Sequence, residues 1–252
     1  MRHEFALYTA GISAACLDKQ LSSVITIVDE QLWHRLKHVL RTPPGAIVCL
    51  FDQTSAIEAQ LCAFGSKNQL QFSIISFIKK SILTPQIIVM LPLLKREALT
   101  DALYSCVELG ANHVQLVTTE KSQHAWATER DNQRCQKIMV AAAEQSKQFT
   151  LPTMGNPISL ADAVAALPKN SFRVHCDPQG AVLWDILRQI ENGKPATLVL
   201  SFGPEGDLTD TERTHLYHHQ FVASALTPTV VRSTQALVIA LGALRSGGSY
   251  QV

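Results

Sequence analysis

The chain has 252 residues, of which 46% are hydrophobic and 17% are charged, and its formal net charge is +1. This length and apolar content suit one large domain or two unequal ones. The small net charge excludes a globally basic nucleic-acid binder, while a local basic patch is compatible with it. No apolar run reaches the roughly 18 residues of a membrane span, and residues 1–4 lack the layout of a signal peptide. We therefore expect a cytoplasmic protein.

The cysteines indicate neither disulfides nor a metal site. Six of them are scattered along the chain without a Cys-x-x-Cys pair: Cys16, Cys49, Cys62, Cys106, Cys135 and Cys176. In a cytosolic chain such residues are most simply reduced and mostly buried thiols, and this spacing does not favour zinc. The sequence therefore predicts no bound metal.

Closely spaced β-strands are predicted in the first 75 residues. Short β-branched or alternating stretches occupy residues 25–27, 46–51, 57–64 and 70–78, and turn-forming residues separate them. Strands at this spacing are typical of a small barrel.

A basic segment, residues 33–41, lies between the first two of these strands. Its apolar neighbours recur at helical spacing on one side: Leu32, Leu36, Val39 and Leu40. The basic side chains fall largely on the other side: His34, Arg35, Lys37, His38 and Arg41. Residues 42–45 then end the helix. Such a face is most often simply solvated, and the functional alternative is a surface that binds RNA.

The pattern changes near residue 80, where strands begin to alternate with helices. Strands are expected at residues 87–91, 114–117, 172–176, 197–202 and 221–223, and helices at 95–109, 132–148 and 182–190. This alternation predicts a parallel α/β layer. We therefore expect two domains, residues 1–75 and residues 80–252.

The most informative turn follows the apolar strand 197–202. It reads Gly203-Pro204-Glu205-Gly206-Asp207, and a helix start follows at residue 210. The glycines allow positive φ and close backbone approach, and Pro204 fixes one angle. Parallel sheets place ligands at the carboxyl ends of their strands. The turn lacks the features of phosphate-binding and dinucleotide-binding loops, so neither a nucleoside triphosphate nor NAD is favoured. The alternative is an ordinary strand-to-helix turn in which Glu205 caps the following helix.

A series of short motifs carries a resemblance to a known family. In chain order they are His38-Val39-Leu40-Arg41, Gly45, Glu108-Leu109-Gly110, Thr119-Glu120-Lys121-Ser122, Lys137-Ile138, Ala142-Ala143-Glu144-Gln145-Ser146, Leu151-Pro152, Gly203-Pro204-Glu205-Gly206 and Val230-Val231-Arg232. This succession resembles the bacterial family that methylates N3 of a uridine in 16S ribosomal RNA, a branch of the SPOUT methyltransferases. The resemblance covers essentially the whole chain.

The resemblance implies a fold, a cofactor and partners. It implies an N-terminal PUA-like β-barrel that binds RNA and a C-terminal α/β domain with a deep trefoil knot. The knot would bind S-adenosylmethionine, and homodimerisation would complete it. The RNA partner would be 16S ribosomal RNA or the small ribosomal subunit, contacted by Arg35, Lys37 and Arg41.

The resemblance also implies which residues hold the cofactor. Three adjacent loops would do so: the segment after Cys176, the turn at Gly203, and residues 225–233. The expected cofactor-binding residues are Cys176, Leu200, Phe202, Gly203, Pro204, Glu205, Gly206, Ala225, Leu226 and Val231. A methyl donor with an adenine and an amino-acid tail needs backbone groups at close range and an apolar wall, which glycines and these apolar side chains can supply.

Arg232 is the expected catalytic residue. Methylation of uridine N3 requires loss of the imide proton, and a cation can stabilise the negative charge that develops on the ring. The alternative for Arg232 is a structural salt bridge. The family pattern has glycine, arginine and glutamate where this chain has Thr227, Thr229 and Thr234. These departures keep open a second hypothesis: a cofactor-binding, RNA-binding paralogue with an altered RNA target or lost catalysis.

A homodimer is also expected from the residues themselves. The alanine-rich helix around residues 138–143 and the last helix, residues 237–244, carry more apolar surface than one small sheet needs.

Overall fold

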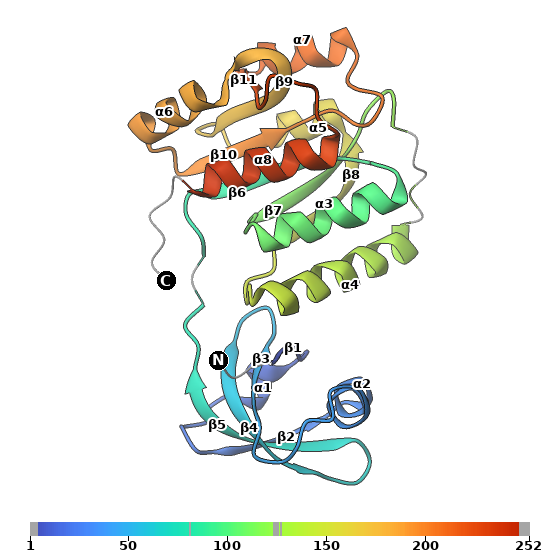
Figure 1. The fold of residues 1–252 in the computed structure, drawn as a ribbon, viewed down its shortest axis with the longest axis vertical. Helices are drawn as coiled ribbons and strands as arrows, with labels where there is room; N and C mark the ends of the chain where they lie inside the picture. The colour runs from blue at the N-terminus through green and yellow to red at the C-terminus, as the bar shows by residue number, and fades with distance from the viewer. Residues whose placement is uncertain (1–4, 81, 123–125, 127, 247–252) are drawn as a thin grey trace. The chain divides into compact units, whose positions relative to one another are not determined.

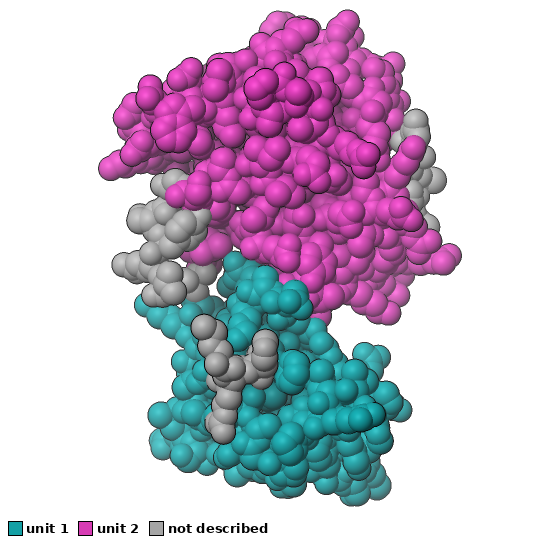
Figure 2. Space-filling model, viewed as in Figure 1, with its two compact units in different colours: residues 1–81, 143–150 teal, residues 82–142, 151–252 magenta. Residues whose placement is uncertain are grey.

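The chain forms two compact units, shown in different colours in Figure 2. The computed structural model describes residues 5–80, 82–122, 126 and 128–246. Residues 1–81 and 143–150 make up the first unit, and residues 82–142 and 151–252 the second. Within the described ranges, no helix has both the length and the apolar character needed to cross a membrane.

The first unit is built on a five-stranded sheet. Its strands are β1 (Phe5–Tyr8), β2 (Val24–Val28), β3 (Ile47–Phe51), β4 (Ala56–Phe64) and β5 (Gln69–Phe77), in the order β1-β3-β4-β5-β2. β1 pairs with β3 in parallel, and the other pairs are antiparallel. The four strands that the sequence predicts are confirmed. The pattern did not predict the short strand β1 or the single helical turn α1 (Ile12–Ala15), because each is only four residues long.

The basic segment is helical but does not keep the periodicity of an α-helix. Helix α2 (Glu30–His34) continues as a π-helical turn, η1 (Arg35–Val39), in which the Leu40 amide donates to the Arg35 carbonyl at 2.8 Å. A π-turn has more residues per turn, so it shifts every later side chain around the axis. Leu36 remains fully buried, whereas Val39 is 64% exposed. The prediction that Val39 lies on the apolar side is therefore wrong.

The second unit is built on a six-stranded sheet in which every pairing is parallel (Figure 1). Its strands are β6 (Gln86–Pro92), β7 (His113–Thr118), β8 (Thr153–Ser159), β9 (Phe172–Val182), β10 (Thr197–Ser201) and β11 (Phe221–Ala225), in the order β11-β9-β10-β6-β7-β8. The predicted parallel α/β layer is confirmed.

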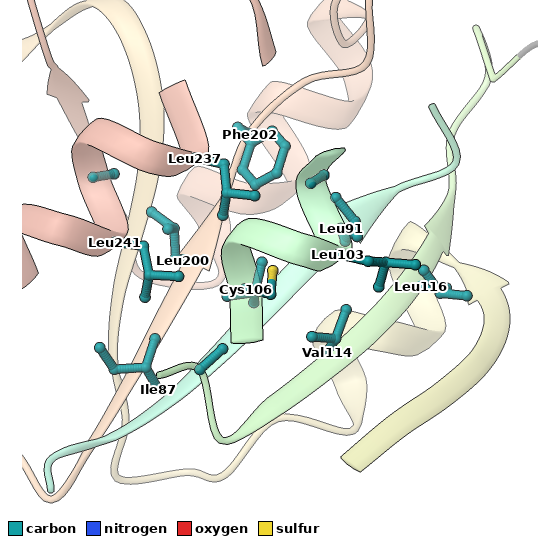
Figure 3. Close-up of a cluster of buried hydrophobic side chains, with 14 of the residues drawn as sticks. Ile87, Leu91, Leu103, Cys106, Val114, Leu116, Leu200, Phe202, Leu237 and Leu241 are labelled. Atoms are coloured by element: carbon teal, nitrogen blue, oxygen red, sulfur yellow. The ribbon is translucent and has the colours of Figure 1, made fainter. Parts of the chain in front are cut away.

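Side chains alternate between the two faces of this sheet and form two cores. On one face, strand residues such as Leu198 and Leu200 pack with helices α3 (Arg96–Glu108) and α8 (Ser233–Ser246), where Leu103 and Leu241 lie close to the strands (Figure 3). On the other face, Val199 packs with α5 (Leu160–Ala165) and α7 (Asp210–His218). The remaining helices are α4 (Thr128–Ser146) and α6 (Leu183–Gly193).

The apolar side of the last helix is used within the chain. Leu237, Leu241 and Leu244 of α8 belong to the core cluster over the sheet, and each is at least 96% buried. The expectation that this side of α8 is surplus apolar surface is therefore wrong, because α3 and the sheet cover it. The apolar side of α8 therefore does not support a dimer, and the dimer stays a prediction.

A buried arginine fixes the end of α8. The guanidinium of Arg245 donates to the Gly110 carbonyl at 2.5 Å, to the Pro85 carbonyl at 2.7 Å and to Asn112 Oδ1 at 2.6 Å. A buried charge is stabilised only when it is hydrogen-bonded in this way. Arg245 thereby ties the last helix to the start of β6 and to the turn that precedes β7.

Candidate functional site

A cavity of about 470 Å³ lies in the second unit, at the carboxyl end of β10 and beside the middle of β9. Parallel sheets commonly place ligands at this edge. Four segments line the cavity: the first turns of α3, the middle of β9, the turn after β10, and the start of α8. The lining residues are Glu97, Ala98, Asp101, Cys176, Pro178, Phe202, Gly203, Pro204, Glu205, Asp207, Val230, Val231, Arg232, Ser233, Thr234 and Ala236.

The turn after β10 is closed by its own backbone. The Asp207 amide donates to the Pro204 carbonyl at 2.9 Å. A Cβ on Gly203 would lie 2.8 Å from Asp207 Oδ1, so a larger residue there would displace that carboxylate. Neither Gly203 nor Gly206 adopts the positive φ that glycine allows, whereas Asp207 does, with φ of 61°. Aspartate is one of the few residues that tolerate this conformation.

The carboxylate of Asp207 helps to hold that unusual backbone. Its Oδ1 accepts from the Leu208 amide at 2.7 Å, and its Oδ2 accepts from Arg213 Nη1 at 2.8 Å. The ion pair to Arg213 is largely exposed on the aspartate side, so it contributes on the order of 0.5 kcal/mol. The side chain therefore adds local hydrogen bonds that hold this left-handed residue in place.

Glu205 caps a helix, but not the one that follows it. Its Oε1 accepts from the backbone amide of Lys95, the residue that precedes α3, at 3.0 Å. The following helix, α7, is instead capped by Thr209 and Glu212, which form a reciprocal capping box. The prediction that Glu205 caps the following helix is thus wrong, because Glu205 caps α3 and not α7. The carboxylate connects the turn to the first residues of α3.

Strand β9 opens where it borders the cavity. His175 pairs with Ala223 and Ala181 with Ser224, so residues 176–180 lie outside the ladder between them. A Cβ on Gly180 would lie 2.3 Å from the backbone carbon of Ala223. Cys176 and Pro178 of this segment line the cavity. Burial raises the pKa of the Cys176 thiol to about 12, so the group facing the cavity is neutral at physiological pH.

His175 precedes this segment and is almost fully buried, with no hydrogen-bond partner for Nδ1 among the described residues. Burial lowers the pKa of His175 to about 4, and the nearby carboxylates of Asp177 and Asp207 oppose that shift. The imidazole is therefore neutral at physiological pH, and its charged form is disfavoured in the folded state.

Because of His175, we predict that the folded protein loses stability in acid. Because its pKa is lower in the folded chain than the ordinary 6.5, its contribution to stability is complete above pH 6.5 and is lost as the pH falls towards 4. The free energy of unfolding should decline across that window with a slope approaching about 1.4 kcal/mol per pH unit. Urea unfolding at a series of pH values measures this slope, and His175→Gln should flatten it. An equal slope in the variant would assign the decline to other groups.

Arg232 stands at the start of α8 and lines the cavity. Its guanidinium has no hydrogen bond or ion pair to any part of the chain that the structure describes. The next residue, Ser233, donates from Oγ to the Gly203 carbonyl at 2.7 Å and so joins the start of α8 to the turn. The alternative role of Arg232 was a structural salt bridge. No carboxylate among the described side chains forms one with it.

The predicted cofactor residues divide into two groups. The structure brings seven predicted site residues together around the cavity: Cys176, Phe202, Gly203, Pro204, Glu205, Val231 and Arg232. The other four do not line it: Leu200, Gly206, Ala225 and Leu226. Leu200 is fully buried because alternation along β10 directs its side chain into the core under α3 and α8.

The contribution of α3 to the cavity was not predicted. Glu97 and Asp101 line the cavity from this helix. Their spacing of four places them on one side of a helix, which was a visible signal, but nothing in the sequence says which element that side faces. Ser233 lies within the predicted segment 225–233 but was not named as a cofactor-binding residue. Thr234 directly follows it and was noted only as a departure from the family pattern.

The predicted RNA-binding residues belong to the first unit and have different surroundings. Arg35 Nη1 lies 2.8 Å from Glu144 Oε2, so its charge is already paired. The Lys37 ammonium lies 4.3 Å from the centre of the Trp33 ring, a cation–π contact. Arg41 is exposed and has a positive φ of 50°. The basic face therefore offers two cations without an ion-pair partner among the described residues, Lys37 and Arg41.

Known proteins resemble this chain in sequence. A family model described as an RNA methyltransferase domain matches residues 82–245. The ribosomal RNA small subunit methyltransferase E of Synechocystis sp. is 26% identical over 232 residues, covering 90% of this chain and 74% of the relative. The protein of the same name from Rickettsia conorii is 24% identical over 231 residues, covering 91% and 92%.

Solved structures resemble it in fold. The ribosomal RNA small subunit methyltransferase E of Neisseria gonorrhoeae, solved with S-adenosylmethionine, gives a TM-score of 0.82 at 22% identity and covers 97% of this chain and 98% of that one. A methyltransferase from Legionella pneumophila, also solved with the cofactor, gives 0.81 at 22% identity and covers 98% of both chains. At this identity the likeness shows a shared fold.

The family model includes every residue that lines the cavity, and it spans well over half of the sequence. The resemblance seen in the ordered motifs is thereby confirmed at the level of the family. The chain belongs to the RNA methyltransferase domain family.

Proposed function

We propose that the protein transfers a methyl group from S-adenosylmethionine to N3 of a uridine in 16S ribosomal RNA of the small subunit. The observation that carries this proposal is the cavity at the strand ends, where the Gly203 turn, the open segment of β9 and the guanidinium of Arg232 meet. The names of the two curated relatives support the RNA substrate, and the two solved relatives support the cofactor.

The cavity suits this cofactor in size and charge. Its volume falls within the range of about 300–1,000 Å³ that is typical of small-molecule sites. Four carboxylates line it, those of Glu97, Asp101, Glu205 and Asp207, against the single guanidinium of Arg232. This excess of negative charge favours a ligand that carries a sulfonium and an ammonium group. Phe202 and Val231 add apolar surface for an adenine.

The residues of the chain would act by positioning and by electrostatics. When bound, the cofactor supplies a methyl group on a positively charged sulfur. The turn and the β9 segment would fix its orientation, since alignment of the reacting atoms lowers the barrier substantially. Arg232 would face the uracil ring and stabilise the negative charge left when the N3 proton passes to solvent water. The neutral Cys176 thiol adds no competing charge beside that centre.

We extend the proposal to the two units and to the cell. The first unit would be a PUA-like barrel that binds RNA, supported by its five-stranded sheet and basic face. The second would be a trefoil-knotted catalytic domain, supported by the order β11-β9-β10-β6 at the cavity edge. We infer a cytoplasmic location, where ribosomal RNA of bacteria is found.

A second candidate is an RNA-binding paralogue that holds the cofactor but has lost catalysis or changed its RNA target. Thr229 and Thr234 favour it, because the family pattern has charged residues at both positions. Thr234 lines the cavity, so its loss of charge bears directly on the site.

One experiment separates the two candidates. Calorimetric titration with S-adenosylmethionine tests the cavity, and nucleoside analysis of small-subunit RNA treated with protein and cofactor tests the reaction. We expect binding and the appearance of N3-methyluridine. Binding without any methylated nucleoside would favour the paralogue, and no binding would overturn both.

The basic face yields a prediction about salt. Replacing Lys37 and Arg41 together by alanine should weaken RNA binding and reduce the slope of log affinity against log salt by about 2, since each phosphate contact releases roughly one counterion. Affinity for the cofactor should not change. Lys19→Ala, at another exposed position of the same unit, is the control.

Arg35→Ala should act mainly on stability, because it leaves Glu144 without its cation. Unaltered RNA binding in the double variant would return this face to ordinary solvated surface.

The homodimer is a further prediction, now based on other residues. Trp184 of α6 is 61% exposed. Val182, two residues before it, and Val238 of α8 are exposed as well. A large exposed aromatic side chain is typical of an interface. Sedimentation velocity at micromolar concentration should give a dimer, and Trp184→Glu should shift it towards monomer. Gln189→Glu adds the same charge to the same helix and should not. A monomeric wild-type protein would exclude the dimer.

A further inference from the structure

The carboxylate of Glu212 holds two separate segments beside the cavity. Its Oε2 accepts from the Thr209 amide at 2.9 Å and completes the cap of α7. Its Oε1 accepts from the Glu120 amide at 2.8 Å, in the segment that follows β7. A charged acceptor makes stronger hydrogen bonds to amides than a neutral one does. Glu212 therefore fixes residues 119–122 to the helix that begins directly after the Gly203 turn.

That segment is packed against the turn itself. A Cβ on Gly206 would lie 3.3 Å from Lys121 Cβ, 3.5 Å from Lys121 Cδ and 3.9 Å from the Lys121 carbonyl. The segment has its own closure as well, because the Thr119 amide donates to Ser122 Oγ at 2.9 Å. The backbone at Lys121 is thus fixed on both sides, and the stem of its side chain runs along Gly206.

Lys121 presents a charge that the described part of the chain does not neutralise. The residue is exposed, and its ammonium has no ion pair or hydrogen bond to any described residue. This unpaired cation stands beside an acidic cavity, which is lined by four carboxylates. A polyanion that approached this edge would meet four carboxylates against one unpaired guanidinium, that of Arg232, so a second cation beside the turn would reduce the repulsion.

We propose that Lys121 binds a backbone phosphate of the RNA substrate beside the Gly203 turn, and that Glu212 is a positioning residue that holds Lys121 there. The inference rests on the proposed function, because it assumes that RNA reaches the cavity. It adds a contact in the second unit to the basic face of the first. The contact is to phosphate, so it carries affinity and register and does not read the base.

Substitution of the exposed lysine tests the contact without disturbing the fold. Lys121→Gln removes the charge and leaves a polar side chain that is shorter by one bond, and Lys169→Gln makes the same change at another exposed position of the second unit. We expect Lys121→Gln to weaken binding of small-subunit RNA several-fold at low salt and to reduce the salt slope by about 1. Lys121→Arg should restore both quantities, and Lys169→Gln should leave both at the wild-type values.

A double-mutant cycle tests the positioning role. Glu212→Gln retains one acceptor oxygen, so it can hold the cap of α7 or the Glu120 amide but not both. If Glu212 acts through Lys121, the loss of RNA affinity caused by Lys121→Gln should be smaller in the Glu212→Gln background than in the wild type. A purely structural Glu212 would lower the melting temperature and leave that loss unchanged, which would overturn the positioning role.

The outcomes also separate this inference from the proposed function. Titration with S-adenosylmethionine should give the same affinity for wild type and Lys121→Gln, because Lys121 does not line the cavity. If the wild-type protein binds cofactor and RNA, and Lys121→Gln binds RNA with unchanged affinity and salt slope, the phosphate contact is overturned and the proposed function stands. If the wild type binds neither, both fail.

Discussion

Replacing Arg232 by alanine is expected to lower the rate of single-turnover methylation about a hundredfold. The guanidinium lines the cavity and has no partner among the described residues, so it is available to face the uracil ring. Removing a preorganised donor at a developing negative charge typically costs about 3 kcal/mol in the transition state. Because the charge develops only during reaction, the dissociation constants for cofactor and RNA should change little.

Two further variants make this result specific. Arg232→Lys should recover only part of the rate, because an ammonium lacks the planar fork of a guanidinium. Arg130→Ala removes an exposed arginine from α4 and should leave the rate unchanged. If Arg232→Ala methylates as fast as wild type, the charge on the ring is stabilised elsewhere. If the wild type itself transfers no methyl group, the RNA-binding paralogue becomes the better account.

Gly180→Val should have the largest effect on the architecture of the cavity. A Cβ at this position would lie 2.3 Å from the Ala223 carbon and 2.4 Å from the Ser224 amide nitrogen, and these backbone atoms are held by the pairing of β9 with β11. Overpacking of this kind costs typically 1–3 kcal/mol, and a backbone clash with a β-branched residue belongs at the upper end. The open segment of β9 would have to move, so cofactor binding should fall with stability.

A glycine elsewhere in the second unit gives the matched control. Gly242 lies within α8, and a Cβ there would meet nothing within 4 Å. Gly242→Ala should therefore raise the free energy of unfolding by about 0.5–1 kcal/mol, because glycine is a poor helix former. Chemical denaturation measures both variants, and calorimetric titration measures the cofactor. If Gly180→Val is as stable as the wild type, β9 and β11 can move apart without loss of free energy, and the prediction is wrong.

Hydrophobic patterning predicted the centre of the second unit because its inner strands, β6 and β10, are mostly buried. The stretch at residues 197–202 is continuous and apolar, and it forms the central strand β10. Strand β8 was missed, since Gly155 and Pro157 interrupt its pattern and it pairs with only one neighbour, β7. The error at Val39 has a different origin, because the π-turn arises from backbone hydrogen bonding that side-chain periodicity does not encode.

From residue pattern alone, the candidate site was predictable only at the turn that follows β10; Cys176, Val231 and Arg232 were predicted from the family resemblance. The turn at Gly203 could be recognised because a strand end and a helix start bracket it. The acidic side of α3 could not be assigned to the cavity, since Glu97 and Asp101 look like any exposed pair on a helix. The open segment of β9 depends on how Gly180 meets Ala223, and such a contact between strands leaves no pattern in either one. The left-handed conformation of Asp207 was likewise not foreseen.

The anchorage of Arg245 has a consequence for biosynthesis. This residue lies 160 positions after Pro85, whose carbonyl it binds, and α8 also supplies one wall of the cavity through Arg232 and its neighbours. A ribosome makes β6 long before α8, so a nascent chain lacks both the anchor and that wall until α8 has emerged from the exit tunnel. Ligand binding at the cavity would therefore begin only after α8 has folded onto the sheet, and a chain cut short before α8 would have no working site.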